Sequence, residues 1–455
     1  MFKCTGNCLL CKRCYNTDKR NKGKTKPLFI PDGFISDIDL KGYGIAFDIG
    51  TTTVAGVMWD FAKKELVSSL TLSNPQAAYG ADVISRIAFA DSEENLLLLQ
   101  RKITECLNEI IDISCKNAGT ENEAVNRISV CANPTMAHLL LGISPKSLAK
   151  APYKPNYSGT VTTTAKELGL NIKPNAEVTV MPNIAGHVGS DITADILAID
   201  MEKYKGNSLL VDIGTNGEIV YFNGKTMLAC SAAAGPAFEG ASIHNGMRAE
   251  SGAIERFRIK DDDIIVSVIG DTEPRGICGS GIIDIASELV KNNIVDKTGR
   301  MLSENEYRTK YGESPLSKRL SENADGRLMI IAENNIVITQ KDIREIQLAK
   351  AAIAAGIKAL LKEAGDRADE LDRIFLAGAF GSYIDKESAV SIGLLPRIDK
   401  DKIIPVGNAA GAGALTVLAS SDGQQKAKRI SETVKHINLY SQSCFQKDYL
   451  NEMAF

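Results

Sequence analysis

The residues best suited to carry out chemistry form a four-residue string, Asp-Ile-Gly-Thr, which occurs at residues 48–51 and again at residues 212–215. In each copy a β-rich run reaches the aspartate, turns through glycine and hydroxyl or amide residues, and resumes as a second β-rich run. This pattern predicts two β-hairpins with tight polar tips. At such a tip glycine lets backbone N–H groups approach an anion, hydroxyls donate, and the carboxylate can hold a metal ion or a water. Two tips in one chain predict two half-domains that close on one phosphate-bearing ligand.

The aspartates of the two strings are the candidate catalytic residues. Mg²⁺ prefers one or two carboxylates, with water and phosphate oxygens as its other ligands. A second carboxylate can orient a water for attack on the terminal phosphoryl group. We therefore expect Asp48 to position Mg²⁺ and Asp212 to orient water at the phosphates of ATP. The turn residues expected to bind these phosphates are Gly50, Thr51, Thr52, Thr53, Gly214, Thr215, Asn216 and Gly217.

A third glycine-rich segment follows an expected strand at residues 373–376. Its strand-to-helix turn suits a nucleoside, and the residues expected to bind it are Gly378, Ala379, Phe380 and Gly381. One such turn by itself is more often structural. Two similar hairpins and this turn in one chain favour nucleotide binding.

Four of the ten cysteines are clustered near the start of the chain, at Cys4, Cys8, Cys11 and Cys14. The spacing Cys-x3-Cys-x2-Cys-x2-Cys brings four thiolates into a short loop that can wrap a [4Fe–4S] cluster, although the Cys-Pro of bacterial ferredoxins is missing. Zinc and unmetallated thiols are the alternatives, and structural zinc sites normally separate their cysteine pairs by a longer span. The first three cysteines also match radical-SAM spacing, but no barrel-like repeat follows. The other six cysteines are expected to be buried thiols.

Composition limits the class of protein. With 455 residues, 44% hydrophobic and 24% charged, the chain is long enough for two or three cores. Neither an apolar run near the ~18 residues of a membrane span nor a signal peptide is present, so a cytoplasmic protein without membrane contact is expected. Residues 1–26 hold eight basic side chains and one acid, whereas 45 basic and 55 acidic side chains remain elsewhere. Because no aromatic residues interleave, this basic arm is interpreted as a solvated linker, or as a docking surface for an acidic partner, rather than a nucleic-acid site.

Alternating strand and helix patterns predict an α/β fold. Beyond the hairpins, expected strands lie at residues 66–72, 127–131, 178–181 and 373–376, and expected helices at 82–90, 96–116, 343–364 and 409–418. Residues 150–175 are interpreted as a loop, and the helix at 409–418 as the last one. The expected domains are a cysteine and linker segment at 1–26, a first lobe at 41–205, a second lobe with a returning helix at 206–420, and a polar tail at 421–455.

The two hairpins and the string Leu-Ala-Gly-Ala-Phe-Gly at residues 376–381 resemble the phosphate and adenosine motifs of the actin-like ATPase superfamily, which includes sugar kinases, Hsp70 and actin. The glycine turn at residues 276–284 resembles a further element that faces the nucleotide, which adds Gly279 and Ser280 to the expected cofactor-binding residues. The resemblance implies two ribonuclease-H-like lobes with a nucleotide cleft between them.

A narrower resemblance, to the reductive activators of corrinoid proteins, covers residues 41–420. It rests on five strings: Asn-Pro-Gln-Ala-Ala-Tyr-Gly-Ala-Asp-Val-Ile-Ser-Arg-Ile at 74–87, Asn-Pro-Thr-Met-Ala-His-Leu-Leu-Leu-Gly at 133–142, Ala-Ala-Ala-Gly-Pro-Ala-Phe-Glu-Gly at 232–240, Gly-Met-Arg-Ala at 246–249, and residues 340–350. The resemblance implies that ATP drives the one-electron reduction of a Co(II) corrinoid to Co(I), which restores the methyl acceptor of a methyltransferase. It also implies a corrinoid protein and a low-potential electron donor as partners, and it allows a homodimer. Such activators usually carry a ferredoxin domain or ferredoxin-like clusters, whereas this chain has the short cysteine segment.

Two other functions compete with this hypothesis. One is a small-molecule kinase on the same fold, and the other is an ATP-dependent binding switch with a zinc-bound N-terminal segment. An activator of a radical dehydratase is a nearer variant, but such activators share one cluster across a dimer through two cysteines per chain.

Several single residues have both a functional and a structural interpretation. A hydroxyl at Ser231 or Ser242 could approach cobalt or a phosphate, and a hydroxyl satisfied by the backbone is favoured. Glu218 and Glu239 could assist Mg²⁺ or water, or simply accept local hydrogen bonds. Structural roles are favoured for His138 and His187, whereas Arg248 could meet an acidic partner or a phosphate.

Overall fold

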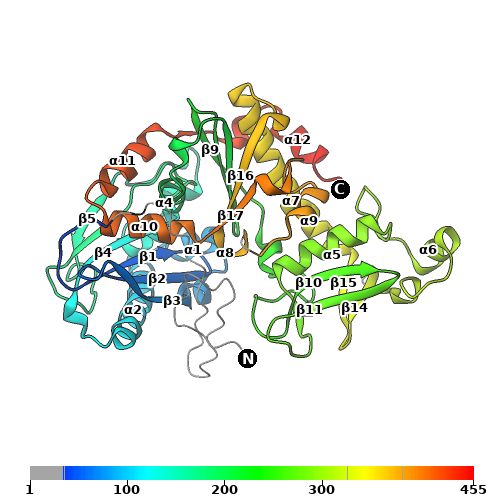
Figure 1. The fold of residues 1–455 in the computed structure, drawn as a ribbon, viewed down its shortest axis with the longest axis horizontal. Helices are drawn as coiled ribbons and strands as arrows, with labels where there is room; N and C mark the ends of the chain where they lie inside the picture. Colours follow the sequence, from blue (N-terminus) through cyan, green and yellow to red (C-terminus); the bar gives the residue numbers. More distant parts are fainter. Residues whose placement is uncertain (1–33, 35, 325, 382) are drawn as a thin grey trace.

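The computed structural model describes residue 34 and residues 36–324, 326–381 and 383–455 (Figure 1). The expected cysteine segment lies outside these residues. The α/β class is confirmed, because two large mixed sheets are flanked by helices.

The first lobe is built on a six-stranded sheet. Its strands lie in the order β3 (Glu65–Ser73), β2 (Thr53–Asp60), β1 (Tyr43–Ile49), β4 (Val125–Ala132), β6 (Glu177–Val180) and β5 (Val161–Thr164). The central strand β1 pairs antiparallel with β2 and parallel with β4, and it is buried from Gly44 onward, as expected where both faces of a sheet are covered. The helices of this lobe are α1 (Val83–Phe89), α2 (Glu93–Ala118), α3 (Pro134–Leu140) and α4 (Ser190–Ile199).

The second lobe repeats the strand order of the first. Its sheet runs β17 (Ile403–Gly407), β16 (Leu371–Ala377), β7 (Asn207–Ile213), β8 (Gly217–Phe222), β9 (Met227–Ala232) and β18 (Lys435–His436). Strand β7 pairs antiparallel with β8 and parallel with β16, as β1 does with β2 and β4. The two half-domains expected from the repeated string are therefore present and share a five-strand order, in which β9, β8, β7, β16 and β17 correspond to β3, β2, β1, β4 and β6, whereas β18 and β5 extend opposite edges.

The remaining helices and a side extension complete the second lobe. The helices are α7 (Gln340–Ala364), α8 (Gly378–Gly381), α9 (Lys386–Ser391), α10 (Ala409–Ala419), α11 (Gly423–Thr433) and α12 (Phe445–Asn451). The extension, on the right in Figure 1, contains β10 (Ala253–Lys260), β11 (Asp263–Val268), β12 (Gly276–Ile277), α5 (Gly279–Lys291), α6 (Glu304–Tyr311), β13 (Leu320–Asn323), β14 (Gly326–Ala332) and β15 (Ile336–Thr339). None of the helices in the described ranges is both long and apolar enough to span a lipid bilayer.

Helix α10 returns from the second lobe to the first, as expected. The hydroxyl of Ser129 on β4 donates to the Ala414 carbonyl at 2.6 Å, and the Cys131 thiol donates to the Ala410 carbonyl at 3.3 Å. Glycine at position 413 is required here, because a Cβ atom would lie 2.0 Å from the carbonyl oxygen of Ala194 on α4. Small side chains thus let the backbones of α10 and α4 approach closely, and this contact ties the lobes together.

Three expectations about unstructured segments are wrong. The loop expected at residues 150–175 contains strand β5, whose short Val-Thr-Thr-Thr run pairs antiparallel with β6. Helices α11 and α12 follow α10, so α10 is not the last helix; α11 was missed because only Ala427 and Ile430 mark its apolar face. The first lobe also includes contacts from before its expected start at residue 41. The Phe34 ring packs edge-on against the Trp59 ring, with 5.3 Å between the ring centroids.

The C-terminal residues are fixed along α7 by polar contacts. The Gln347 amide donates to the Met453 carbonyl at 2.5 Å, and the ammonium of Lys350 donates to the Ala454 carbonyl. The same ammonium lies 5.7 Å from the centroid of the Phe455 ring. Lys350 is 1% exposed, and burial lowers its pKa to about 8. The folded state therefore carries the cost of a buried charge near neutral pH.

This burial predicts a pH-dependent effect of Lys350→Met on stability. Below pH 8 the lysine is charged in both states, so its burial cost is fully present; as the pH rises toward 10.5, only the folded state loses the proton, and the cost fades. The free energy of unfolding of the variant minus that of the wild type should fall by about 3 kcal/mol between pH 7 and pH 10.5. Urea unfolding at several pH values measures this difference. Arg101→Met, which removes an exposed guanidinium that stays charged throughout this pH range, is the control and should give a flat difference. A flat difference for Lys350→Met would contradict the prediction.

Candidate functional site

Both predicted hairpins are present, and each tip is closed by a hydrogen bond from its glycine amide, although the first tip is one residue longer than the second. In the first, Ile49 pairs with Val54 and the Gly50 amide donates to the Thr53 carbonyl at 2.9 Å. In the second, Ile213 pairs with Gly217, and the amide of residue 214 donates to the carbonyl of residue 216 at 2.9 Å. Each tip thus follows directly from a buried central strand that ends in aspartate, and such a turn can present donors to an anion.

The carbonyl groups of the first tip are held from behind by the strings at 74–87 and 133–142. The Asn74 side-chain amide donates to the Gly50 carbonyl at 2.9 Å, and its backbone amide donates to the Thr52 carbonyl at 2.9 Å. The Asn133 amide donates to the Thr51 hydroxyl at 3.0 Å. Because the acceptors of the tip are engaged by the protein, they do not oppose an anion in front of it. The sequence marked these strings by resemblance, but it did not show that they converge on the hairpin.

Arg86 on α1 is the cation behind this tip. Its side chain is fully buried, and its guanidinium donates to the carbonyls of Thr51 at 2.6 Å and Gly80 at 2.8 Å. Burial lowers the pKa of Arg86 to about 10, so it stays charged at neutral pH. A buried positive charge at this position fixes the Thr51 carbonyl and makes the tip electrostatically favourable for a phosphate.

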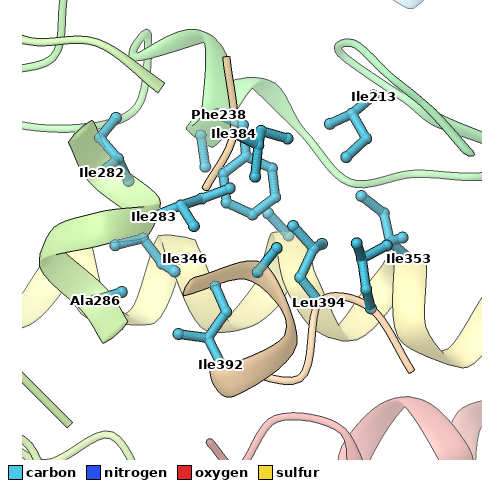
Figure 2. Packing of buried hydrophobic residues seen from close by; sticks show 14 of the residues in the cluster. Ile213, Phe238, Ile282, Ile283, Ala286, Ile346, Ile353, Ile384, Ile392 and Leu394 are labelled. Atoms are coloured by element: carbon cyan, nitrogen blue, oxygen red, sulfur yellow. The ribbon is translucent and has the colours of Figure 1, made fainter. Parts of the chain in front are cut away.

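A single carboxylate joins the two tips. The Thr52 hydroxyl of the first hairpin donates to Glu239 Oε2 at 3.0 Å, and the Thr215 hydroxyl of the second donates to Glu239 Oε1 at 2.9 Å. Glu239 ends the short 3-10 helix η5 (Pro236–Glu239). The preceding residue, Phe238, is buried among Ile283 of α5 and Ile346 of α7, as Figure 2 shows. The bridging carboxylate is therefore mounted on a segment anchored in the core of the second lobe.

Three further carboxyl groups surround the aspartates. Burial raises the pKa of Asp191 to about 7, and it raises the pKa values of Asp195 and Glu218 well above their usual range. The charges of Asp212 and Asp48 add to the shifts of Asp191 and Asp195. Asp195 is fully buried, and neither of its carboxylate oxygens has a hydrogen-bond partner in the described part of the chain. The site thus concentrates negative charge, which a cation or bound protons must offset.

Sequence reasoning named Glu218 but missed Asp191 and Asp195 as site residues. Their signal was a Gly-Ser-Asp string that opens an apolar helix, with a second aspartate one turn later. Charged residues inside such a helix are rarely buried without a partner or a function.

The expected nucleoside turn lies directly against the second aspartate. Strand β16 passes into α8 at Gly378, which has φ +82°, and a Cβ atom there would lie 2.4 Å from Asp212 Oδ1. Glycine is therefore required both by the backbone conformation and by the space. Gly279 and Ser280 begin α5, whose Ile283 lies beside Phe238 in Figure 2. The two turns expected to face the nucleoside, at Gly378 and at Gly279, thus both belong to the second lobe.

Asp48 and Asp212 offer chemistry suited to Mg²⁺ held mainly by water and phosphate. Asp48 is 9% exposed at the end of β1, and Asp212 occupies the equivalent register in β7. Within the described ranges, no group of three or more His, Cys, Asp or Glu side chains has the geometry to hold a metal ion.

The remaining single-residue interpretations have mixed outcomes. His138 receives the Asn156 amide at 3.1 Å and contacts the Pro134 carbonyl at 2.6 Å, which supports a structural role. The expectation of backbone-satisfied serine hydroxyls is wrong. The Ser231 hydroxyl donates to Glu218 at 3.0 Å, because the two side chains are cross-strand neighbours, and the Ser242 hydroxyl is buried without a hydrogen bond among the described residues.

The structure also shows the surroundings of Arg248 and of the six scattered cysteines. Arg248 crosses between the lobes and donates to the Ser73 hydroxyl at 2.9 Å. Of the six scattered cysteines, five are buried, as expected; Cys444 is only partly so.

Comparison with known proteins covers nearly all of the described chain. Residues 206–455 match the family model for the C-terminal domain of RACo, described as its ASKHA domain, and residues 43–204 match the model for the RACo middle region. A curated protein from Eubacterium limosum, corrinoid activation enzyme RamQ, is 38% identical over 425 residues, which are 91% of this chain and 70% of that protein. A Methanosarcina barkeri protein named [Co(II) methylated amine-specific corrinoid protein] reductase is 27% identical over 453 residues, covering 91% of this chain and 77% of that protein.

A solved structure gives the same result for the fold. The reductive activator for a corrinoid, iron-sulfur protein superposes with a TM-score of 0.81 and is 34% identical in sequence. The match covers 92% of this chain and 67% of that one.

The position of Arg86 predicts that Arg86→Met weakens both folding and nucleotide binding. Loss of the two charge-assisted hydrogen bonds should lower the free energy of unfolding by about 3 kcal/mol and leave the Thr51 carbonyl unheld. ATP binding, measured by calorimetry on folded protein, should be about tenfold weaker. Arg101→Met on the exposed face of α2 is the matched control and should change neither quantity. Unchanged ATP affinity in folded Arg86→Met would contradict this role.

Proposed function

Since this chain belongs to the RACo family of reductive activators of corrinoid proteins, we propose that it couples ATP to the reduction of a Co(II) corrinoid protein to Co(I). The observation that carries the ATP part is the pair of Asp-Ile-Gly-Thr tips, which end equivalent strands of two equivalent sheets and share Glu239. Each such tip is an anion-binding turn, and two facing tips suit the phosphates of one nucleotide.

In the proposed site the first tip and Asp48 serve Mg²⁺ and the phosphates, while Asp212 orients the attacking water. The nucleoside lies at the Gly378 turn, behind which Asp212 is packed. Bound Mg²⁺ would offset the negative charge shared by the aspartates and the phosphates. The chain's own contribution is to fix the tips: the carbonyls of the first are held from behind by Asn74 and Arg86, so its donors face the nucleotide.

The two lobes provide the conformational step. Contacts between them include the Thr52–Glu239 hydrogen bond and the Arg248–Ser73 hydrogen bond, which are separate from the contacts of α10 with the first lobe. Because ATP and its hydrolysis products make different contacts with the tips, they stabilise different degrees of closure. Only such a difference in binding between states can change affinity for the corrinoid partner.

The electron is proposed to reach cobalt from a low-potential donor through the cysteine segment. Cys4, Cys8, Cys11 and Cys14 offer four thiolates, the ligand set of a [4Fe–4S] cluster, which supplies one-electron transfer when bound. One electron converts one Co(II) substrate to Co(I). We place the protein in the cytoplasm, where the thiolates stay reduced.

The decisive experiment uses anaerobically purified, iron-reconstituted full-length protein with a Co(II) corrinoid protein and a low-potential reductant. We expect Co(I), which is monitored by its absorbance, to appear only when ATP is present. A Cys11→Ser and Cys14→Ser double variant should lose iron and cobalt reduction but keep ATP binding. Iron-free wild type with tightly bound zinc would overturn the electron route, and phosphorylation of a small molecule instead of cobalt reduction would indicate a kinase.

The aspartate roles predict that Asp48→Asn and Asp212→Asn each reduce ATP hydrolysis by about 100-fold or more, because each removes a carboxylate that acts at the phosphates. Asp263→Asn, an exposed aspartate in the side extension, should have wild-type activity. Phosphate release measures all three. Retained hydrolysis in either site variant would remove that aspartate from the mechanism.

A further inference from the structure

The bridge between Thr52, Glu239 and Thr215 has a consequence for nucleotide binding. Each threonine hydroxyl has one hydrogen to donate, and in the structure both hydrogens point to the same carboxylate, at 3.0 and 2.9 Å. The same hydroxyls belong to the two tips at which nucleotide phosphates are proposed to bind. A phosphate oxygen that accepts from either threonine must therefore take a hydrogen bond away from Glu239.

The location of Glu239 makes this competition local. Phe238 is clamped in the core by isoleucines of α5 and α7, so η5 does not have to move as a whole (Figure 2). The Glu239 side chain is only partly buried, and rotation about its own bonds is enough to release both hydroxyls. Release also removes a link between the lobes, because Thr52 belongs to the first lobe and Glu239 to the second.

We propose that the Glu239 carboxylate is an internal competitor for the nucleotide's terminal phosphates, which must displace it from Thr52 and Thr215. This deepens the proposed function, since it assigns a residue that sets the strength and selectivity of ATP binding. Glu239 lies in the string at residues 232–240 that resembles corrinoid activators, so displacement transmits the presence of phosphate into that segment. Ligands without phosphate do not meet this competition.

The test compares three calorimetric probes on the intact chain: Mg-ATP, inorganic triphosphate and adenosine. Glu239→Gln keeps the shape of the side chain but removes its charge and one of its two acceptors. We expect ATP and triphosphate to bind about tenfold more tightly to this variant, since one charge-assisted hydrogen bond corresponds to about that factor. Adenosine affinity should not change. Equal or weaker triphosphate binding would overturn the proposal, and a loss of affinity confined to Mg-ATP would instead indicate that Glu239 assists the Mg²⁺–water shell.

Two further variants separate contact from charge. Glu239→Asp keeps the charge but is too short to reach both hydroxyls, so it should also bind triphosphate more tightly than the wild type. Wild-type affinity in Glu239→Asp would show that only charge matters, which contradicts the proposal. Glu250→Gln removes an exposed carboxylate from the same lobe and should leave the affinity for triphosphate unchanged at 0.5 M salt, where long-range effects are screened.

These measurements need neither a corrinoid protein nor a reductant. Failure of cobalt reduction alongside the expected binding pattern would therefore contradict the proposed function alone, whereas cobalt reduction with unchanged triphosphate binding in the variants would contradict only the role of Glu239.

Discussion

The arrangement depends on one electrostatic constraint: two hairpin tips must present donors to a polyanion at a place already crowded with carboxyl groups. Burial, with the neighbouring charges of Asp212 and Asp48, raises the pKa of Asp191 to about 7 and the pKa of Asp195 well above its usual range. The Glu239 carboxylate accepts hydrogen bonds from the threonine hydroxyls of both tips. A site built in this way suits a ligand that arrives with its own cation, as a magnesium nucleotide does.

The first tip is shaped by groups that lie far apart in the sequence. Asn74, Arg86 and Asn133 all donate to it, and together they occupy the acceptors that would repel an anion. Arg86 is the most consequential of the three, because a fully buried guanidinium is expensive unless its hydrogen bonds are satisfied. The structure supplies two backbone carbonyls and the Met136 sulfur as acceptors and thereby leaves the positive charge available to the site.

Lobe attachment and lobe closure use different contacts. The α10–α4 contact, which only glycine at position 413 permits, is a close backbone packing that holds the lobes together. Elsewhere the lobes meet through side-chain hydrogen bonds such as Arg248–Ser73, which cost less free energy to exchange. A rigid attachment on one side with replaceable contacts on the other is the mechanical basis for closure that responds to the ligand.

Much of the architecture followed from local patterns. The repeated aspartate string, the long apolar periodicity of α7 with its Thr339–Asp342 capping box, and the small-residue run of α10 each specified an element, because strand alternation, capping and apolar spacing are local properties. Strand β5 and helix α11 were not predicted. The run of threonines in β5 and the two buried apolar side chains of α11 are too weak a pattern to indicate an element.

The candidate site divides in the same way. The sequence by itself determined that Asp48 and Asp212 end equivalent strands, because the residues that form a hairpin tip are neighbours in the chain. Only the tertiary structure decided that Arg86 supports Thr51, that Glu239 bridges the tips, and that Asp191 and Asp195 share their electrostatic environment. The Arg86–Thr51 and Glu239–Thr52 contacts join residues 35 and 187 positions apart, and no local pattern encodes which distant side chain will meet a given hydroxyl or carbonyl.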